Sequence, residues 1–171
     1  DFLPANLDFS QSNNRPSTNL NGDIVAFEAL YNGVNQIFVK LISTNELILV
    51  SRPFDYTVEN NIPPNDSSYA PKISADGRFV VFHSRASNLV PDDFNNHADI
   101  FIFDLESLNS VASGLGGETA NIGKLTKISN SPTGEGGNGS SFYPAISKNG
   151  EFIVFESEAT NLDSNVTSVG N

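Results

Sequence analysis

The stretch Pro71-Lys-Ile-Ser-Ala-Asp-Gly77-Arg-Phe-Val-Val-Phe82-His83 decides the fold, because the same pattern occurs three times in the chain. The other two copies begin at Pro16 and Pro144 and align with it without gaps. The three prolines are 55 and 73 residues apart, so insertions of unequal length separate similar units. Self-similarity of this kind indicates a repeat architecture.

Each copy predicts a β-hairpin. Asn21-Gly22, Asp76-Gly77 and Asn149-Gly150 are dipeptides that two-residue hairpin turns prefer, because both central residues of such a turn need a positive φ. We expect each turn to join a short strand, such as Lys72 to Ser74, to a longer one, such as Arg78 to Phe82. The proline is expected to open the first strand, where its missing N–H costs least.

Two more strands are expected after each hairpin. Residues 36–41 and 47–51 follow the first hairpin, and residues 99–105 and 125–129 follow the second in matching order. One unit therefore has four antiparallel strands. The runs Phe79 to Phe82, Ile100 to Phe103 and Phe152 to Phe155 are apolar at consecutive positions, which predicts strands that are covered on both faces.

Four short strands per unit, buried on both faces and recurring along the chain, are typical of β-propeller blades. We predict an all-β chain of four-stranded antiparallel blades in an incomplete ring, either a fragment or a half-propeller. Residues 1–171 form one partial domain, with units at approximately 11–52, 67–130 and 140–171. A β-sandwich is the alternative, but it does not explain why the unit recurs. The sequence has no Met, which indicates a chain processed or cut from something longer.

The repeats resemble those of TolB-type, WD40-like bacterial propellers. The resemblance is carried by Pro71 to Phe82, by Ala86-Ser-Asn-Leu-Val90 and by Asp99-Ile-Phe-Ile-Phe-Asp-Leu105, and the third unit repeats part of it as Ser157-Glu-Ala-Thr-Asn-Leu162. It implies an extracytoplasmic setting, periplasmic, secreted or at the cell surface, and a role as an interaction platform. In some peptidases such propellers accompany a hydrolase domain, and fold alone does not decide between these roles.

The charge of the chain limits its partners. With 20 Asp and Glu against 9 Lys and Arg, the formal net charge is −11. Nucleic acid is disfavoured as a partner, because phosphate binding needs clustered Lys and Arg. No apolar run approaches the length of a membrane span, and the absence of Cys excludes disulfides and thiolate metal sites.

The best metal-site signal is the acidic loop at residues 92–99. Asp93, Asn95 and Asp99 form a D-x-N-x-x-x-D spacing, and Asp92 could add a further oxygen. Calcium prefers such carboxylate and amide oxygens, and the resembled repeats have the same acidic spacing here. We predict a calcium site from these four residues. The alternative is a loop in which Asp93 and Asn95 bond their own backbone and Asp99 caps a strand.

No catalytic motif is evident, and the chain itself is not expected to be an enzyme. His83 and His97 are the only histidines. The positions equivalent to His83 in the other units hold Glu28 and Glu156, which indicates a surface site at a strand end. There is no Gly-x-Ser-x-Gly elbow, zinc helix or phosphate loop with Lys.

Three linkers with loop-like composition are candidate contact surfaces: residues 52–68, 108–123 and 131–141. The leading prediction is a binding or scaffold module that engages a protein or glycan through its loops and is stabilised by calcium. One alternative is the propeller segment of a larger hydrolase with its catalytic domain elsewhere. Another is a structural repeat that self-associates through an open blade edge.

Overall fold

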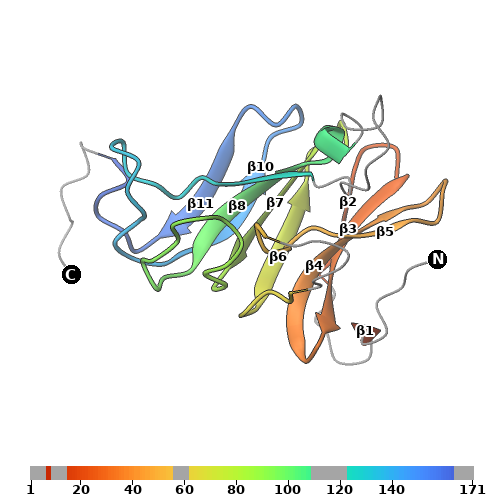
Figure 1. Cartoon of the computed structure of the whole chain (residues 1–171). Helices are drawn as coiled ribbons and strands as arrows, with labels where there is room; N and C mark the ends of the chain where they lie inside the picture. The colour runs from red at the N-terminus through yellow and green to blue at the C-terminus, as the bar shows by residue number, and fades with distance from the viewer. Residues whose placement is uncertain (1–6, 9–14, 56–61, 109–122, 164–171) are drawn as a thin grey trace, which may run out of the picture.

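The computed structural model describes residues 7–8, 15–55, 62–108 and 123–163 of the chain. These residues form three antiparallel β-sheets that follow one another across the molecule in sequence order (Figure 1). The chain is all-β, built from blades of antiparallel strands in an incomplete ring, as the repeat predicts. In these ranges no helix is long and apolar enough to cross a membrane.

The first sheet contains the strands before residue 50. They are β1 (Leu7–Asp8), β2 (Ser17–Thr18), β3 (Ile24–Tyr31), β4 (Val34–Leu41) and β5 (Leu47–Leu49). Strands β1 and β2 both pair with β3, and β4 and β5 follow β3 in the sheet. The strands expected at 36–41 and 47–51 are present as β4 and β5, whereas β1 is an addition that the repeat pattern does not contain.

The second sheet is a complete blade. It has the order β6 (Ser68–Ile73), β7 (Phe79–Ser84), β8 (Asp99–Asp104) and β9 (Lys124–Lys127), and a short 3-10 helix, η1 (Leu105–Leu108), follows β8. The third sheet pairs β10 (Ser141–Ile146) with β11 (Ile153–Ser157). The three sheets thus repeat the same hairpin, which is β2–β3, β6–β7 and β10–β11.

The hairpin turns are wider than the predicted two-residue type. Only the glycines have positive φ, for example 82° at Gly77, while Asp76 is not among the residues with positive φ. In the second unit the Ser74 hydroxyl accepts the N–H of Phe79, and the Ser74 backbone N–H donates to the Phe79 carbonyl. The same bonds join Ser147 to Phe152. The serine side chain holds the turn open, so the prediction of a tight turn was wrong.

In the second and third units the repeat proline lies inside a bulged strand and does not open it, whereas Pro16 of the first unit directly precedes β2 as predicted. The register of β6 against β7 shifts between Tyr69 and Lys72, and β10 shifts at the equivalent place. The residue before the proline has a left-handed backbone in both bulges, with φ of 54° at Ala70 and 51° at Tyr143. A bulge leaves one residue outside the strand ladder, so its backbone N–H is available to another partner.

The main core lies between the first and second sheets. Ala26, Ile37 and Val39 of the first sheet pack with Val80, Phe82, Phe101 and Phe103 of the second. The predicted burial on both faces is confirmed for β7 and β8, where Val80, Val81 and Phe82 are fully buried. It is wrong for β11, because Phe152 and Val154, on one face of the third sheet, are 71% and 67% exposed.

Candidate functional site

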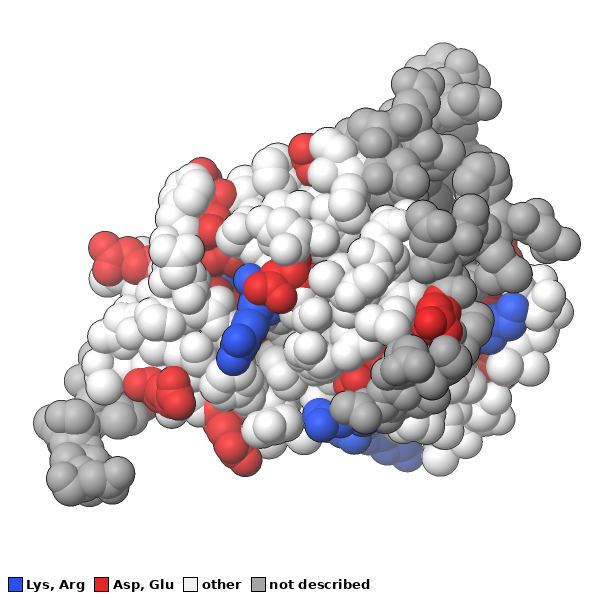
Figure 2. Space-filling view, turned by 90° about the horizontal axis from the view of Figure 1, so that it is seen from below, with Lys and Arg blue, Asp and Glu red and all other residues white. Residues whose placement is uncertain are grey.

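A polar hollow lies where the second and third sheets meet at their loop ends. Its volume is about 530 Å³, and its lining includes Asp66, Arg85, Asp93, Asn95, His97 and Ser140. These residues come from the segments that lead into β6, β8 and β10 and from the segment that leaves β7. Figure 2 views the molecule from below and shows basic and acidic side chains close together on this face.

The loop at 92–99 folds around Asn95. The Asn95 side-chain oxygen accepts the His97 backbone N–H at 3.1 Å, and its amide nitrogen donates to Asp99 at 2.9 Å. The same nitrogen donates to the carbonyl of Gly137 at 3.1 Å, which ties this loop to the segment before β10. Asp92 and Asn96 have positive φ, of 62° and 56°, as Asx residues tolerate in tight loops.

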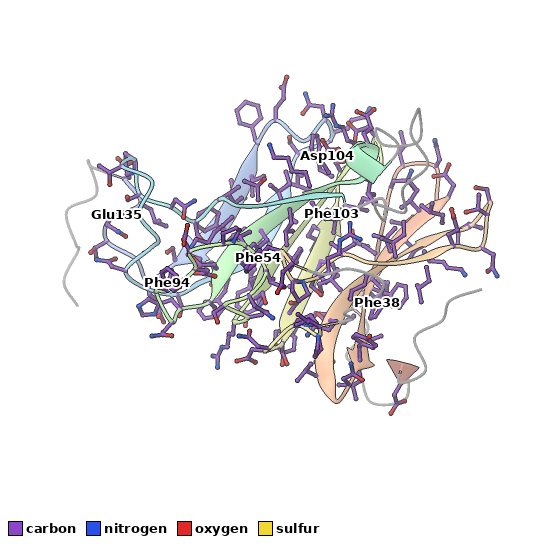
Figure 3. The ribbon with its side chains drawn as sticks, viewed as in Figure 1. Phe38, Phe54, Phe94, Phe103, Asp104 and Glu135 are labelled. Carbon is purple, nitrogen blue, oxygen red and sulfur yellow. The ribbon has the colours of Figure 1, made fainter. Side chains whose placement is uncertain are left out.

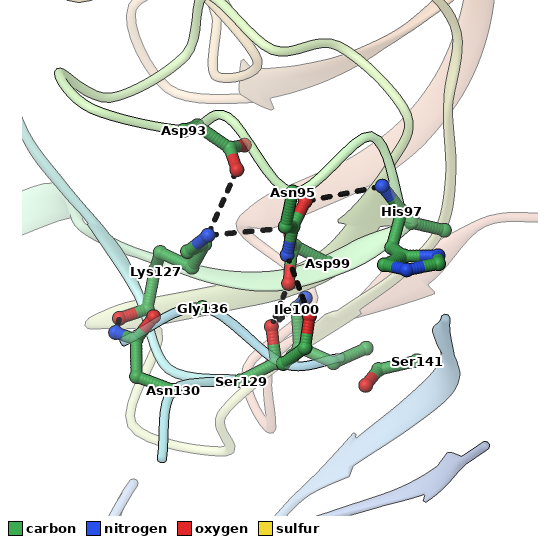
Figure 4. A network of polar contacts seen from close by, with 12 residues as sticks. Asp93, Asn95, His97, Asp99, Ile100, Lys127, Ser129, Asn130, Gly136 and Ser141 are labelled. Atoms are coloured by element: carbon green, nitrogen blue, oxygen red, sulfur yellow. Dashed lines mark hydrogen bonds and ion pairs between the residues drawn. The ribbon is translucent and has the colours of Figure 1, made fainter. Parts of the chain in front are cut away.

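Lys127 of β9 brings a cation to the centre of this loop (Figure 4). Its Nζ lies 2.8 Å from Oδ1 of Asp93 and 3.3 Å from Oδ2 of Asp99. The other Asp99 oxygen accepts a hydrogen bond from the Ser129 hydroxyl. All three charged side chains are buried, with 9% of Lys127, 3% of Asp93 and 0% of Asp99 exposed. The network therefore carries two carboxylates and one ammonium.

Burial sets the protonation of Asp99. It raises the pKa of this carboxyl above the ordinary value, while the Ser129 hydroxyl and the nearby Lys127 ammonium act in the opposite direction. A buried carboxylate without an adjacent cation is costly. Lys127 therefore stabilises the ionised form of the Asp99 carboxyl.

The predicted calcium ligands come together only in part, and calcium does not fit among them in this arrangement. Asp93, Asn95 and Asp99 share the network, whereas Asp92 is exposed at the start of the loop. Lys127 Nζ lies within hydrogen-bond distance of both buried carboxylates, where a metal ion would have to bind. The described ranges hold no group of three or more His, Cys, Asp or Glu side chains suited to a metal. We therefore expect Lys127 to keep calcium out of this loop, because an ion would first have to displace the lysine.

The lining of the hollow also includes two side chains without a hydrogen-bond partner among the described residues. Arg85 is exposed, and within the described residues its guanidinium makes no hydrogen bond or ion pair. The His97 imidazole likewise has no hydrogen-bond partner there, although its backbone N–H is bonded to Asn95. These two side chains can bind a partner without first breaking an internal contact.

His83 is not the surface residue that the sequence predicted. Only 6% of it is exposed, because its ring packs against Tyr69, Phe142 and Tyr143. Burial lowers the pKa of His83 to about 4, and the positive charges of Arg15 and Arg85 act in the same direction. Its Nδ1 accepts the backbone N–H of Tyr143 at 3.4 Å, as a neutral imidazole can.

Three residues of this site were not predicted from the sequence: Lys127, Ser129 and Arg85. Lys127 and Ser129 lie in the strand predicted at 125–129, but nothing local links them to Asp99, about 30 residues earlier. The register that pairs Phe101 with Lys127 brings them together. Arg85 could have been noticed as a basic side chain directly after the β7 apolar run.

Comparisons with known proteins add a weak likeness. No protein-family model matches the chain, and no curated protein matches it. Among solved structures, the crystal structure of TolB from Acinetobacter baumannii is similar, with 17% identity and a TM-score of 0.49. The match covers 86% of this chain and 27% of the TolB chain, so this chain spans about a quarter of that protein.

Proposed function

We propose that the chain is a non-enzymatic binding module that recognises an extended segment of a partner protein at the polar hollow. The observation that carries this proposal is the hollow itself, about 530 Å³ in volume and lined by polar side chains from three loops. Loops on a rigid β-scaffold are a common place for recognition. A polypeptide segment offers N–H donors, carbonyl acceptors and charged side chains, which are the groups this lining can satisfy.

The two sides of the hollow have different roles in this proposal. The Asp93–Lys127–Asp99 network is internally satisfied and fixes the shape of the loop. Arg85 and His97 line the same hollow with unpaired polar groups, so Arg85 would pair with a carboxylate of the partner, in a charge-assisted hydrogen bond. Asn65 and Ser140 also line the hollow, where the Asn65 side chain is bonded to Ser87 and the Ser140 hydroxyl accepts the Ala98 backbone N–H.

We further propose that the module works outside the cytoplasm and that any catalysis belongs to another part of its parent protein. In the described residues, neither His97 nor His83 is hydrogen-bonded to a carboxylate and a nucleophile in the manner of a catalytic triad.

Selection from a random peptide library against the wild-type chain tests the proposal, with a glycan array as the parallel arm. Peptides that bind should contain an acidic residue and should lose about tenfold or more in affinity on Arg85→Glu, because a charge-assisted bond becomes a repulsion. Lys124→Glu is the matched control, since it makes the same charge change on an exposed residue of β9.

Three results would count against the proposal. Peptides that bind Arg85→Glu as tightly as the wild type would place the site elsewhere. Binding confined to the glycan array would replace the protein partner by a sugar. Binding that falls equally in Arg85→Glu and Lys124→Glu would reflect net charge and not the hollow.

A further inference from the structure

The sheets join through a contact that occurs twice in the molecule. In the first seam, between the first and second sheets, Oε1 of Glu28 accepts the backbone N–H of Ala70 at 2.7 Å. In the second seam, between the second and third sheets, Nδ1 of His83 accepts the N–H of Tyr143 at 3.4 Å. Ala70 and Tyr143 are the left-handed bulge residues before the repeat prolines. Each sheet thus offers a side-chain acceptor, and the next sheet offers a bulge N–H.

The hairpin turns form the second half of each seam. A Cβ atom at Gly77 would lie 2.9 Å from Cδ1 of Ile24, and one at Gly150 would overlap the ring of Phe79. The turn glycine of one sheet therefore lies directly on a side chain of the preceding sheet. Ile24 and Phe79 occupy equivalent positions, four residues before Glu28 and His83 respectively.

The third sheet presents the same acceptor surface without a neighbour among the described residues. Phe152 corresponds to Phe79, and Glu156 corresponds to His83. Phe152 is 71% exposed, Val154 between them is 67% exposed, and Glu156 is exposed as well. Among the residues described, nothing hydrogen-bonds the Glu156 carboxylate. This acceptor face is apolar at two of its three positions, as are the corresponding faces in the two existing seams, which hold Ile24 and Ala26 or Phe79 and Val81.

The first sheet presents the corresponding edge, called here the donor edge, although β2 pairs with β3 without a bulge and Arg15 is not among the residues with positive φ. Arg15 precedes Pro16, as Ala70 and Tyr143 precede their prolines, and 45% of its side chain is exposed. The turn glycine of this sheet, Gly22, has no atom within 4 Å of its Cβ position, so its surface is open. Leu20 in the same turn is 71% exposed.

We propose that the acceptor face of Phe152, Val154 and Glu156 binds the donor edge of a second copy of this chain, head to tail. Gly22 of one copy would lie on Phe152 of the other, and Arg15 would lie over Glu156. The charges are complementary at this point, where both existing seams have a neutral N–H donor. Because the contact is heterologous, it closes into a ring or continues as a filament, depending on the rotation between copies.

Sedimentation of the full chain over a range from micromolar to about 1 mM tests this proposal. The wild type is expected to self-associate, with an affinity reduced about tenfold by Phe152→Ser and by Glu156→Arg. Phe94→Ser is the apolar control, because Phe94 is 81% exposed and lies in the loop at 92–99 (Figure 3). Glu135→Arg is the charge control, on the exposed loop before β10.

A charge swap distinguishes the head-to-tail contact from other contacts. Arg15→Glu should weaken association, and the double variant Arg15→Glu with Glu156→Arg should restore it. Because Arg15 also lies 3.9 Å from Glu28, circular dichroism must first show that Arg15→Glu remains folded. Val154→Asp, on an exposed position, gives an independent measure if it does not.

A wild type that is monomeric throughout the range would overturn the proposal. So would association that depends on Phe152 but is unaffected by Arg15→Glu in a folded protein, because this would indicate a symmetric contact between two third sheets. The Arg85→Glu variant should associate normally, so that the outcome is independent of partner binding at the hollow.

Discussion

Replacing Lys127 by Met should destabilise the chain strongly. The substitution removes the cation between two buried carboxylates, at 2.8 Å from Asp93 and 3.3 Å from Asp99. Asp99 keeps its hydrogen bonds from Ser129 and Asn95, whereas Asp93 loses its ion pair. Removing one partner of a buried ion pair typically costs about 3–5 kcal/mol, because a charge is left buried without compensation.

Urea denaturation followed by circular dichroism measures this loss. In a chain of this size, 3–5 kcal/mol also corresponds to a fall in Tm of roughly 10 °C. Lys124→Met is the matched control, because Lys124 lies on the same strand and is exposed. It should cost less than about 0.5 kcal/mol, as surface substitutions usually do.

The pH dependence of the Lys127→Met variant tests the physical reason. Burial already raises the pKa of Asp99, and removal of the ammonium raises it further. A carboxyl whose folded pKa is raised binds its proton more readily in the folded state, so the cost is present above that pKa and is relieved as the pH falls. The loss should therefore be smaller at pH 5 than at pH 7. A loss at pH 7 no larger than that of Lys124→Met would refute the reasoning.

Three further results are expected. The pKa of His83 is lowered from 6.5 to about 4 in the folded chain, so the unfolded chain binds the proton first as the pH falls. The free energy of unfolding should therefore be full above pH 6.5 and should fall toward pH 4, by at most roughly 3 kcal/mol. In urea melts over this range, His83→Gln should remove most of this pH dependence. Gly150→Ala should lower the Tm more than Gly33→Ala, since both have positive φ but only the first would overlap another side chain, that of Phe79; equal losses would mean that backbone strain alone matters. Millimolar calcium should leave the wild-type Tm where excess EDTA leaves it, and a rise of several degrees would show that the ion displaces the lysine.

The hairpins and their strands could be predicted because their signals are local. The apolar runs at Phe79 to Phe82 and Ile100 to Phe103 lie within single strands, and the Asp-Gly and Asn-Gly dipeptides mark the turns. The turn geometry could not be predicted, because it depends on a serine hydroxyl that accepts an N–H five residues later. The exposure of Phe152 also depends on a neighbouring sheet and not on the strand's own sequence.

The candidate site was predictable only where its residues are close in sequence. The spacing of Asp93, Asn95 and Asp99 indicates a clustered loop, and the structure brings these side chains together. Their cation is Lys127, which reaches them through the pairing of β8 with β9. A residue type that repels calcium thus enters the site from a distant segment, and no local spacing rule includes it.

Because the seam hydrogen bond occurs twice along the chain, the three sheets differ in how readily they separate from their neighbours. The second sheet is held on both faces by such a bond: its Ala70 N–H donates to Glu28, and its His83 accepts the N–H of Tyr143. Among the described residues, the first and third sheets each make only one such bond. In a linear array, each unit is held chiefly by its nearest neighbours. We therefore expect the two outer sheets to open first. The amide protons of β7 and β8, in the middle sheet, should exchange last.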